Sequence, residues 1–198
     1  MYINCKVIQL TDEENEKYIV IGVSNVDAQI RRERELNAAS EKANRDALTG
    51  VKSKHAYDES ALKINSEIEY GISSPFAVAV CDVNGLKMVN DTKGHQAGDK
   101  LILDAARVIC DIFKHSPVYR IGGDEFVAIL RGSDYENRQD LIRRMTDWNA
   151  KNHNDGGVII ACGCEAWIAD QDETLEEVFR RADAAMYLNK DSLKNMSN

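Results

Sequence analysis

The sequence predicts an α/β (α+β) fold, a two-layer sandwich in which helices flank a mainly antiparallel sheet. Short apolar runs typical of buried strands alternate with longer segments of helical composition along residues 54–190. Two of these runs, 118–121 and 126–130, are separated only by Gly-Gly-Asp-Glu, which predicts a hairpin. With 198 residues, 43% of them hydrophobic, the chain can fold one domain with its own core and has room for an appendage.

The first 46 residues are expected to form this appendage. Residues 2–10 and 18–23 are strand-like and are joined by a polar turn, so residues 1–26 are expected to form a β-hairpin. Because two strands bury too little surface to be stable alone, this hairpin should pack elsewhere or belong to a preceding domain. Residues 27–46 lack Gly and Pro and are polar nearly all round, which predicts a linker helix, either solvated or paired with another copy.

The remaining elements follow from residue 53 onward. Ser53 is a candidate N-cap for a helix over 54–70. The apolar patterns then predict strands at 76–81, 118–121, 126–130 and 157–167, and helices at 96–113, 134–150 and 174–190. The segment after strand 76–81 is predicted to be a polar loop.

Composition and charge exclude several classes of protein. The net charge of −8 argues against nonspecific nucleic-acid binding, but a phosphorylated substrate remains compatible because a bound cation reverses the local charge. No apolar run approaches the roughly 20 residues that span a bilayer, and no signal peptide is evident. We therefore expect a cytoplasmic domain without membrane contact. The five cysteines lack a CxxC pair and predict neither a disulfide framework nor a zinc site.

Two acidic clusters stand where predicted strands end. Asp82 directly follows strand 76–81, and Asp124 and Glu125 lie at the glycine-rich tip of the predicted hairpin. Carboxylates in such places can hold Mg²⁺ against the phosphates of a nucleotide. Their mutual repulsion would be costly without a cation. Simple solvation explains a single acidic turn well, but it explains two such turns on neighbouring strands less well.

These clusters belong to a series of motifs that resembles the GGDEF family of diguanylate cyclases. Residues 122–126 read GGDEF. The other matching segments, in order, are DALTG at 46–50, DVNGLKMVND at 82–91, Gly94-His95, Gly98-Asp99, and ADAAMYLNK at 182–190. The resemblance covers residues 46–195, and the order and spacing of the motifs argue strongly against coincidence.

The resemblance implies a nucleotidyl-cyclase-like fold and an enzyme that condenses two GTP molecules into cyclic di-GMP with release of two pyrophosphates. The 3′-hydroxyl of one GTP attacks the α-phosphate of the other across a homodimer, with Mg²⁺ or Mn²⁺ as the metal. Positioning and metal-ion charge stabilisation suit this chemistry. The alternatives are a catalytically silent module that binds GTP or a partner as a regulatory domain, and a structural dimerisation unit. The intact acidic residues argue against the silent module.

The resemblance also implies roles for single residues. The side chains of Asp82 and Glu125 and the carbonyl of Val83 match the metal ligands. Asn90 and Asp99 match the residues that read guanine, and the Asp carboxylate can accept the pair of N–H donors that adenine lacks. The catalytic pair is Asp124, near the attacking hydroxyl, and Glu125. The remaining substrate-binding positions are those that hold the phosphates or allow close approach to them: Lys87, Lys190, Lys194, Gly122 and Gly123.

Some positions depart from the common family pattern. Asn84 and Leu86 replace a frequent acid and a frequent Phe without removing a metal ligand. Lys194 replaces a frequent Arg, which keeps the charge but loses the fork geometry of the guanidinium and should weaken GTP binding without abolishing it. The R-x-x-D motif of product-inhibited members is absent, because residues 113–116 read FKHS. We therefore expect no product inhibition through that site.

The expected organisation has three parts. Residues 1–26 form a hairpin, read as the remnant of a preceding PAS-like sensor domain, residues 27–46 form a signalling helix, and residues 47–195 form the cyclase domain. The chain would then be part of a longer signalling protein, in which the upstream sensor sets the spacing or rotation of two cyclase domains.

Overall fold

The computed structural model describes residues 3–11, 17–153 and 157–195. The chain is divided into two compact units, which are Met1–Lys42 and Ala43–Asn198. Among the described residues, no helix combines the length and the apolar character that crossing a membrane requires.

The first unit contains a two-stranded ribbon and a helix. Strands β1 (Ile3–Thr11) and β2 (Lys17–Asn25) pair antiparallel, with Ile3 opposite Asn25 and Thr11 opposite Lys17. Helix α1 (Asp27–Ala43) follows. These elements lie where the sequence predicted them, although Tyr2 and the turn at 12–16 fall outside the described residues. The helix ends three residues earlier than predicted, because residues 44–53 turn back and Ser53 N donates to Asn44 O at 3.0 Å.

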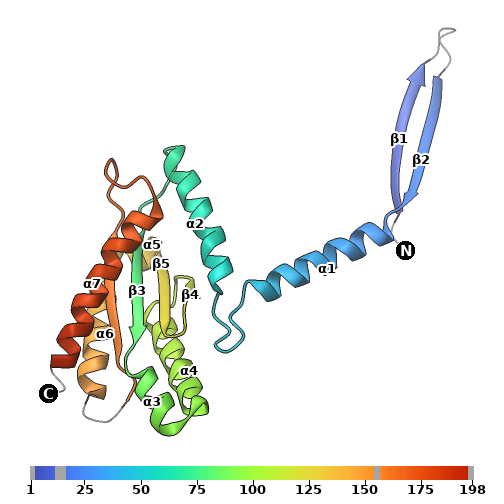
Figure 1. Ribbon diagram of the computed structural model, residues 1–198. Helices are drawn as coiled ribbons and strands as arrows, with labels where there is room; N and C mark the ends of the chain where they lie inside the picture. Colours follow the sequence, from blue (N-terminus) through green and yellow to red (C-terminus); the bar gives the residue numbers. More distant parts are fainter. Residues whose placement is uncertain (1–2, 12–16, 154–156, 196–198) are drawn as a thin grey trace. The chain divides into compact units, whose positions relative to one another are not determined.

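The second unit is built around a four-stranded antiparallel sheet in the order β4-β5-β3-β6 (Figure 1). Its elements along the chain are α2 (Lys54–Glu69), β3 (Ala77–Val83), α3 (Leu86–Lys93), α4 (His95–Ile112), β4 (Val118–Arg120), β5 (Glu125–Leu130), α5 (Gly132–Glu136), α6 (Arg138–Asn152), β6 (Ile160–Ala166) and α7 (Leu175–Asn195). The predicted hairpin is confirmed as β4 and β5, which pair with Arg120 opposite Phe126.

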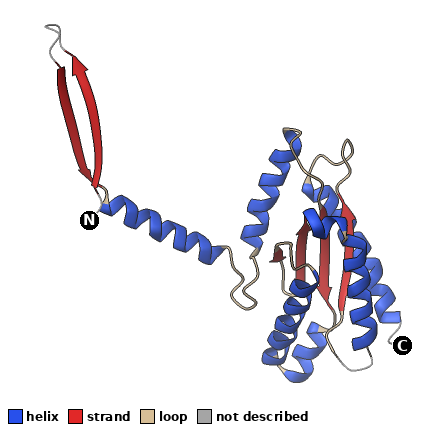
Figure 2. Cartoon of the chain, turned by 180° about the vertical axis from the view of Figure 1, so that it is seen from behind, coloured by secondary structure: helices blue, strands red, loops and turns tan. Residues whose placement is uncertain are grey.

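Helices cover both faces of this sheet (Figure 1, Figure 2). In β3, Cys81 and the other odd-numbered residues pack against α4 and α6, whereas Val78 and Val80 pack against α2 and α7. The α/β fold with an antiparallel sheet and flanking helices is confirmed, but the number of layers in the prediction was wrong. There are three layers, because β3 is an inner strand with apolar side chains on both faces.

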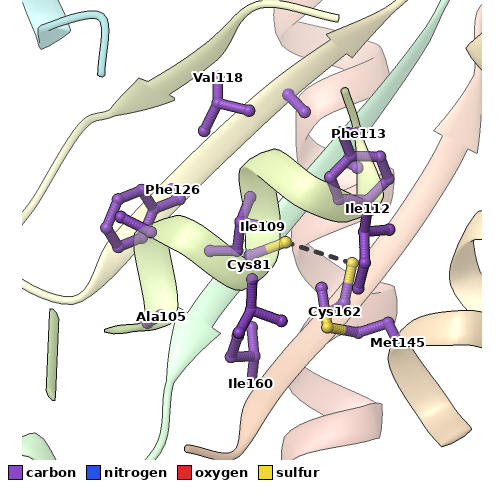
Figure 3. Packing of buried hydrophobic residues seen from close by; sticks show 14 of the residues in the cluster. Cys81, Ala105, Ile109, Ile112, Phe113, Val118, Phe126, Met145, Ile160 and Cys162 are labelled. Carbon is purple, nitrogen blue, oxygen red and sulfur yellow. Dashed lines mark hydrogen bonds between the residues drawn. The ribbon is translucent and has the colours of Figure 1, made fainter. Parts of the chain in front are cut away.

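The cluster on the α4 and α6 face includes two thiols that join neighbouring strands (Figure 3). Cys81 in β3 is the register partner of Cys162 in β6, and their sulfur atoms lie 3.3 Å apart as a hydrogen-bonded pair of free thiols. This hydrogen bond and burial together raise the pKa of Cys162 well above its ordinary value. The pair lies one residue before Asp82 and helps to fix the register there.

Two helical segments differ from the prediction. The segment after β3, predicted to be a loop, is helix α3, which begins and ends at glycines with left-handed backbone, Gly85 (φ +81°) and Gly94 (φ +83°). None of its residues is buried, although Leu86 packs against the edge of the core cluster. The helix predicted over 134–150 is divided into α5 and α6 at Asn137.

Candidate functional site

Both acidic clusters meet at one end of the sheet. Asp82 is the penultimate residue of β3, and its register partner in β5 is Glu125. Val83 N donates to Asp124 O at 3.0 Å, which ties the end of β3 to the tip of the β4–β5 hairpin. The pairing of β3 with β5 therefore brings Asp82, Asp124 and Glu125 together, as their positions on neighbouring predicted strands indicated.

Asp82 is a buried carboxyl beside a lysine. Its side chain is 8% exposed, and Lys190 Nζ from α7 lies 2.7 Å from its Oδ1. Burial raises the pKa of Asp82 above its ordinary value and Asp124 adds to the increase, while Lys190 and Lys194 oppose it. The two lysines therefore offset only part of the effect of burial on this carboxyl group.

The oxygen atoms around Asp82 fit a divalent cation. Asn84 Oδ1 is buried and lacks a hydrogen-bond partner among the described residues, and the buried Asp82 Oδ1 has the Lys190 ammonium 2.7 Å away. Within the described chain, no three His, Cys, Asp or Glu side chains form a cluster that could hold an ion. Mg²⁺ in nucleotide sites is commonly held by one or two carboxylates and by phosphates, so two carboxylates suffice for such a site.

The hairpin tip is tight on one side and open on the other. Ile121 N and Gly122 N both point to Glu125 O, at 3.0 and 3.4 Å. A Cβ on Gly122 would lie 2.5 Å from Glu125 Oε2, whereas a Cβ on Gly123 would meet nothing within 4 Å. Gly122 therefore makes room for the Glu125 carboxylate, and the backbone at Gly123 is open to a ligand.

Arg120 is a residue of the site that the sequence reasoning missed. Its guanidinium donates to Gly123 O from Nε and Nη2, at 3.2 and 2.7 Å, and to the Asp46 carboxylate from Nη1, at 3.1 and 3.3 Å. Asp46 Oδ1 also accepts from Thr49 N and Oγ1, at 2.8 and 2.6 Å. Burial raises the pKa of Asp46, but the bonds from Thr49 and Arg120 outweigh it and lower the pKa below its ordinary value. The first predicted motif, at 46–50, is thus bonded to the hairpin tip.

Helices α3 and α4 carry the residues expected to read guanine. Asn90 in α3 is half-buried, and its side chain lies directly over Gly98 of α4, at a place that a Cβ on residue 98 would occupy. Asp99, the next residue of α4, is exposed. Gly98 therefore lets the two helices approach closely beside Asp99, and the role of Asn90 and Asp99 stays a prediction.

Helix α7 delivers Lys190 to the site. Gly163 of β6 has no space for a Cβ, because the backbone of Ala182 and Met186 lies directly against it. Asn189 Oδ1 accepts a hydrogen bond from Cys162 N at 3.0 Å, which pairs a backbone group of the edge strand. These two contacts hold α7 against β6 one residue before Lys190, and Asn189 is a further residue that the sequence reasoning missed.

Two predicted phosphate-binding lysines are not drawn into contact with the acidic residues. Lys87 is exposed on α3. Lys194 is also exposed and lies 3.6 Å from Asp191 Oδ1 on its own helix. Both side chains face solvent and contact none of the acidic residues of the site. Their roles in binding phosphate remain predictions.

The sequence of the chain is similar to a protein family and to several known relatives. Residues 43–196 match the family described as "Diguanylate cyclase, GGDEF domain". The chain is 30% identical over 158 residues to diguanylate cyclase DgcZ of Escherichia coli K12, covering 78% of this chain and 52% of DgcZ. It is 30% identical over 153 residues to diguanylate cyclase DgcS of Shewanella oneidensis, covering 76% of this chain and 50% of DgcS. The chain thus spans about half the length of these two relatives.

The fold is also similar to a solved structure. The coiled coil and GGDEF domain of DgcB from Caulobacter crescentus, in complex with c-di-GMP, matches with a TM-score of 0.68 and 25% sequence identity. The match covers 83% of this chain and 90% of the DgcB chain.

Proposed function

Because the chain belongs to the GGDEF family of diguanylate cyclase domains, we propose that it condenses two GTP molecules into cyclic di-GMP and releases two pyrophosphates. One observation carries the proposal: Asp82 and Glu125 face each other across β3 and β5, and Lys190 lies 2.7 Å from Asp82. This arrangement provides two carboxylates and a cation at the open end of a sheet, where the phosphates of a nucleotide can be held.

In the proposed reaction, Asp82, Glu125 and the Val83 carbonyl would hold Mg²⁺ or Mn²⁺. When bound, the cation stabilises the negative charge that develops on the reacting phosphate. A bond forms between the 3′-oxygen of one GTP and the α-phosphorus of the other, and the bond to pyrophosphate breaks. In this proposal Asp124 accepts the hydroxyl proton. The same step in the opposite direction closes the ring.

The rest of the site binds and orients GTP. Asn90 and Asp99 read the guanine edge, and Lys87, Lys190 and Lys194 hold the phosphates while Gly122 and Gly123 let the backbone come close. Each chain provides one such half-site. Two chains must face each other before the hydroxyl of one GTP can reach the phosphate of the other, so the proposed catalyst is a homodimer.

The N-terminal unit is proposed to be the end of a PAS-like sensor domain, residues 1–26, followed by a signalling helix, residues 27–46. The exposed apolar side chains of Val7, Ile19 and Ile21 on the ribbon support a role in packing against another surface. The GGDEF domain then occupies residues 47–195, and we propose that it works in the cytoplasm under the control of such a sensor.

A product assay tests this function. The purified chain, incubated with GTP and Mg²⁺, should form cyclic di-GMP and pyrophosphate in a 1:2 ratio, measured by liquid chromatography. Glu125→Gln keeps the shape of the side chain but removes its charge, and it should lower the rate by about 100-fold or more. Glu136→Gln, an exposed change on α5, is the matched control and should keep the rate. GTP binding without product in the unmodified chain would instead support the silent regulatory module.

A further inference from the structure

A groove of about 970 Å³ lies at the end of the sheet opposite to Asp82. Ala77 and Ala166, which are register partners, mark this end of β3 and β6. The groove runs between the C-terminal half of α2 and the loop that joins β6 to α7. We call it the α2–α7 groove, and its lining includes Leu62, Ser66, Glu69, Trp167, Asp170 and Glu173.

Exposed apolar side chains lie in the α2–α7 groove and beside it. Leu62 is 72% exposed, and Tyr70 and Ile72, which flank the groove residue Gly71, are 73% and 72% exposed. Trp167 stacks on Phe76, with ring centroids 5.7 Å apart, and its indole N–H donates to Asp172 O at 3.1 Å. A fixed aromatic ring beside exposed aliphatic side chains is typical of a protein-binding surface.

The charge of the α2–α7 groove has one sign. Glu69, Asp170 and Glu173 are exposed acids, and no Lys, Arg or His is among its lining residues. The fourth acid, Asp172, is buried and paired with Arg181. The other large groove, between α4 and α6, differs because it contains cations such as Arg107 and Lys151.

We propose that the α2–α7 groove is a docking site for a basic amphipathic helix of a partner protein. The apolar face of such a helix would cover Leu62 and Trp167, and its lysines or arginines would face Glu69, Asp170 and Glu173. Helix α1 of a second copy fits less well, because its sequence contains four basic and four acidic residues.

The groove is also the point where α7 begins. Leu175 N, the first residue of α7, donates to Asn65 Oδ1 of α2 at 2.8 Å, and Lys190 lies on the same helix at the other end of the sheet. A docked helix would therefore contact the start of α7, the helix that carries Lys190. The binding itself does not depend on the proposed cyclase activity.

Binding of designed peptides tests the proposal. Trp148→Phe leaves Trp167 as the only tryptophan of the chain, because the sequence contains two. An amphipathic Leu/Lys peptide of about 18 residues, long enough to form a helix when bound, should shift Trp167 emission to the blue and saturate. The same peptide with Glu in place of Lys should produce no shift. Anisotropy of the labelled peptide with the unmodified chain gives the same comparison without the Trp148 change.

Charge reversals locate the site. Asp170→Lys with Glu173→Lys should weaken binding of the Leu/Lys peptide by about tenfold or more. Glu136→Lys with Asp147→Lys, two exposed acids outside the groove, makes the same change in net charge and should leave the affinity within about twofold. Equal weakening by the two pairs, or no saturable shift, overturns the proposal. So does concentration-dependent self-association that Leu62→Lys abolishes, because the occupant would then be a second copy.

Discussion

The charge of Asp82 is subject to opposing electrostatic effects. Burial in β3 and the neighbouring Asp124 disfavour its charge, and Lys190 favours it. A divalent cation shared with Glu125 would relieve this conflict. A single residue thus connects the fold to the proposed chemistry.

Asn189 is predicted to position Lys190. Asn189→Ala leaves Cys162 N unpaired and should lower the free energy of unfolding by about 1–2 kcal/mol. It should also raise the KM for GTP more than it lowers kcat, because Lys190 follows in the same turn. Urea denaturation and steady-state kinetics measure both effects. Asn195→Ala, at the exposed end of α7, is the control, and unchanged stability in Asn189→Ala would show that this bond is unimportant.

The pH dependence of stability should report the Asp172–Arg181 ion pair. The hydrogen bond from Arg181 outweighs burial and lowers the pKa of Asp172 in the folded protein. The stability from this pair is therefore present above the unfolded carboxyl pKa of about 4 and is lost as the pH falls through the folded value.

Asp172→Asn is thus expected to lower the free energy of unfolding by about 1–3 kcal/mol at pH 7, since Arg181 is partly exposed, and by much less near pH 3. Urea denaturation at the two pH values measures the difference. Asp170→Asn, on the same loop but exposed, should change little at either pH. A loss of the same size at pH 3 as at pH 7 would contradict the assignment.

At the scale of single residues, the sequence indicates the acidic positions but not their supports. The order of the motifs is sufficient to single out Asp82, Asp124 and Glu125. Arg120 and Asn189 were missed because their partners, Asp46 and Cys162, lie 74 and 27 residues away, and only the folded chain brings them together. An Arg directly before the glycine hairpin and an Asn directly before Lys190 were the available signals.

Among the elements, the segment after α1 and the β4–β5 hairpin act together. Lys52 N donates to Val118 O at 3.0 Å, and Arg120 N donates to Lys52 O at 2.8 Å, so this segment covers the edge of β4. The Asp46–Arg120 ion pair extends the contact to Gly123, beside the proposed reacting phosphate. The position of the hairpin tip therefore depends on the turn at residues 46–50.

A double-mutant cycle tests this dependence. Asp46→Asn and Arg120→Gln should each lower turnover by about tenfold, and the double variant should be little worse than the more damaging single variant, because both remove the same restraint. The control cycle uses Asp140→Asn and Arg143→Gln, an exposed pair on α6 at 2.9 Å, and should show small additive effects. Additive effects at Asp46 and Arg120 would mean that the two residues act independently.

The elements differ in how clearly the sequence predicts them. Helix α4 and strands β3, β4 and β5 were predicted within two residues, because apolar runs and a Gly-Gly turn define them. Helix α3 was not predicted, because it buries no residue and its limits depend on glycine backbone angles. The third layer was also missed, because an apolar run in the sequence does not indicate which helices cover each face of a strand.

For the molecule as a whole, the proposed chemistry needs more than one chain. One chain provides a single Asp82–Glu125 site, and the reaction joins two GTP molecules through two bonds. Activity should therefore depend on pairs of intact chains and on the contacts that bring two GGDEF domains together.

The most direct measurement is the rate of cyclic di-GMP formation in equilibrated mixtures of unmodified chain and Glu125→Gln, at constant total protein. If both half-sites must be intact, the rate should fall with the square of the unmodified fraction, to about one quarter at equal amounts. A rate that falls in direct proportion to this fraction would mean that each chain works alone, and it would contradict the account.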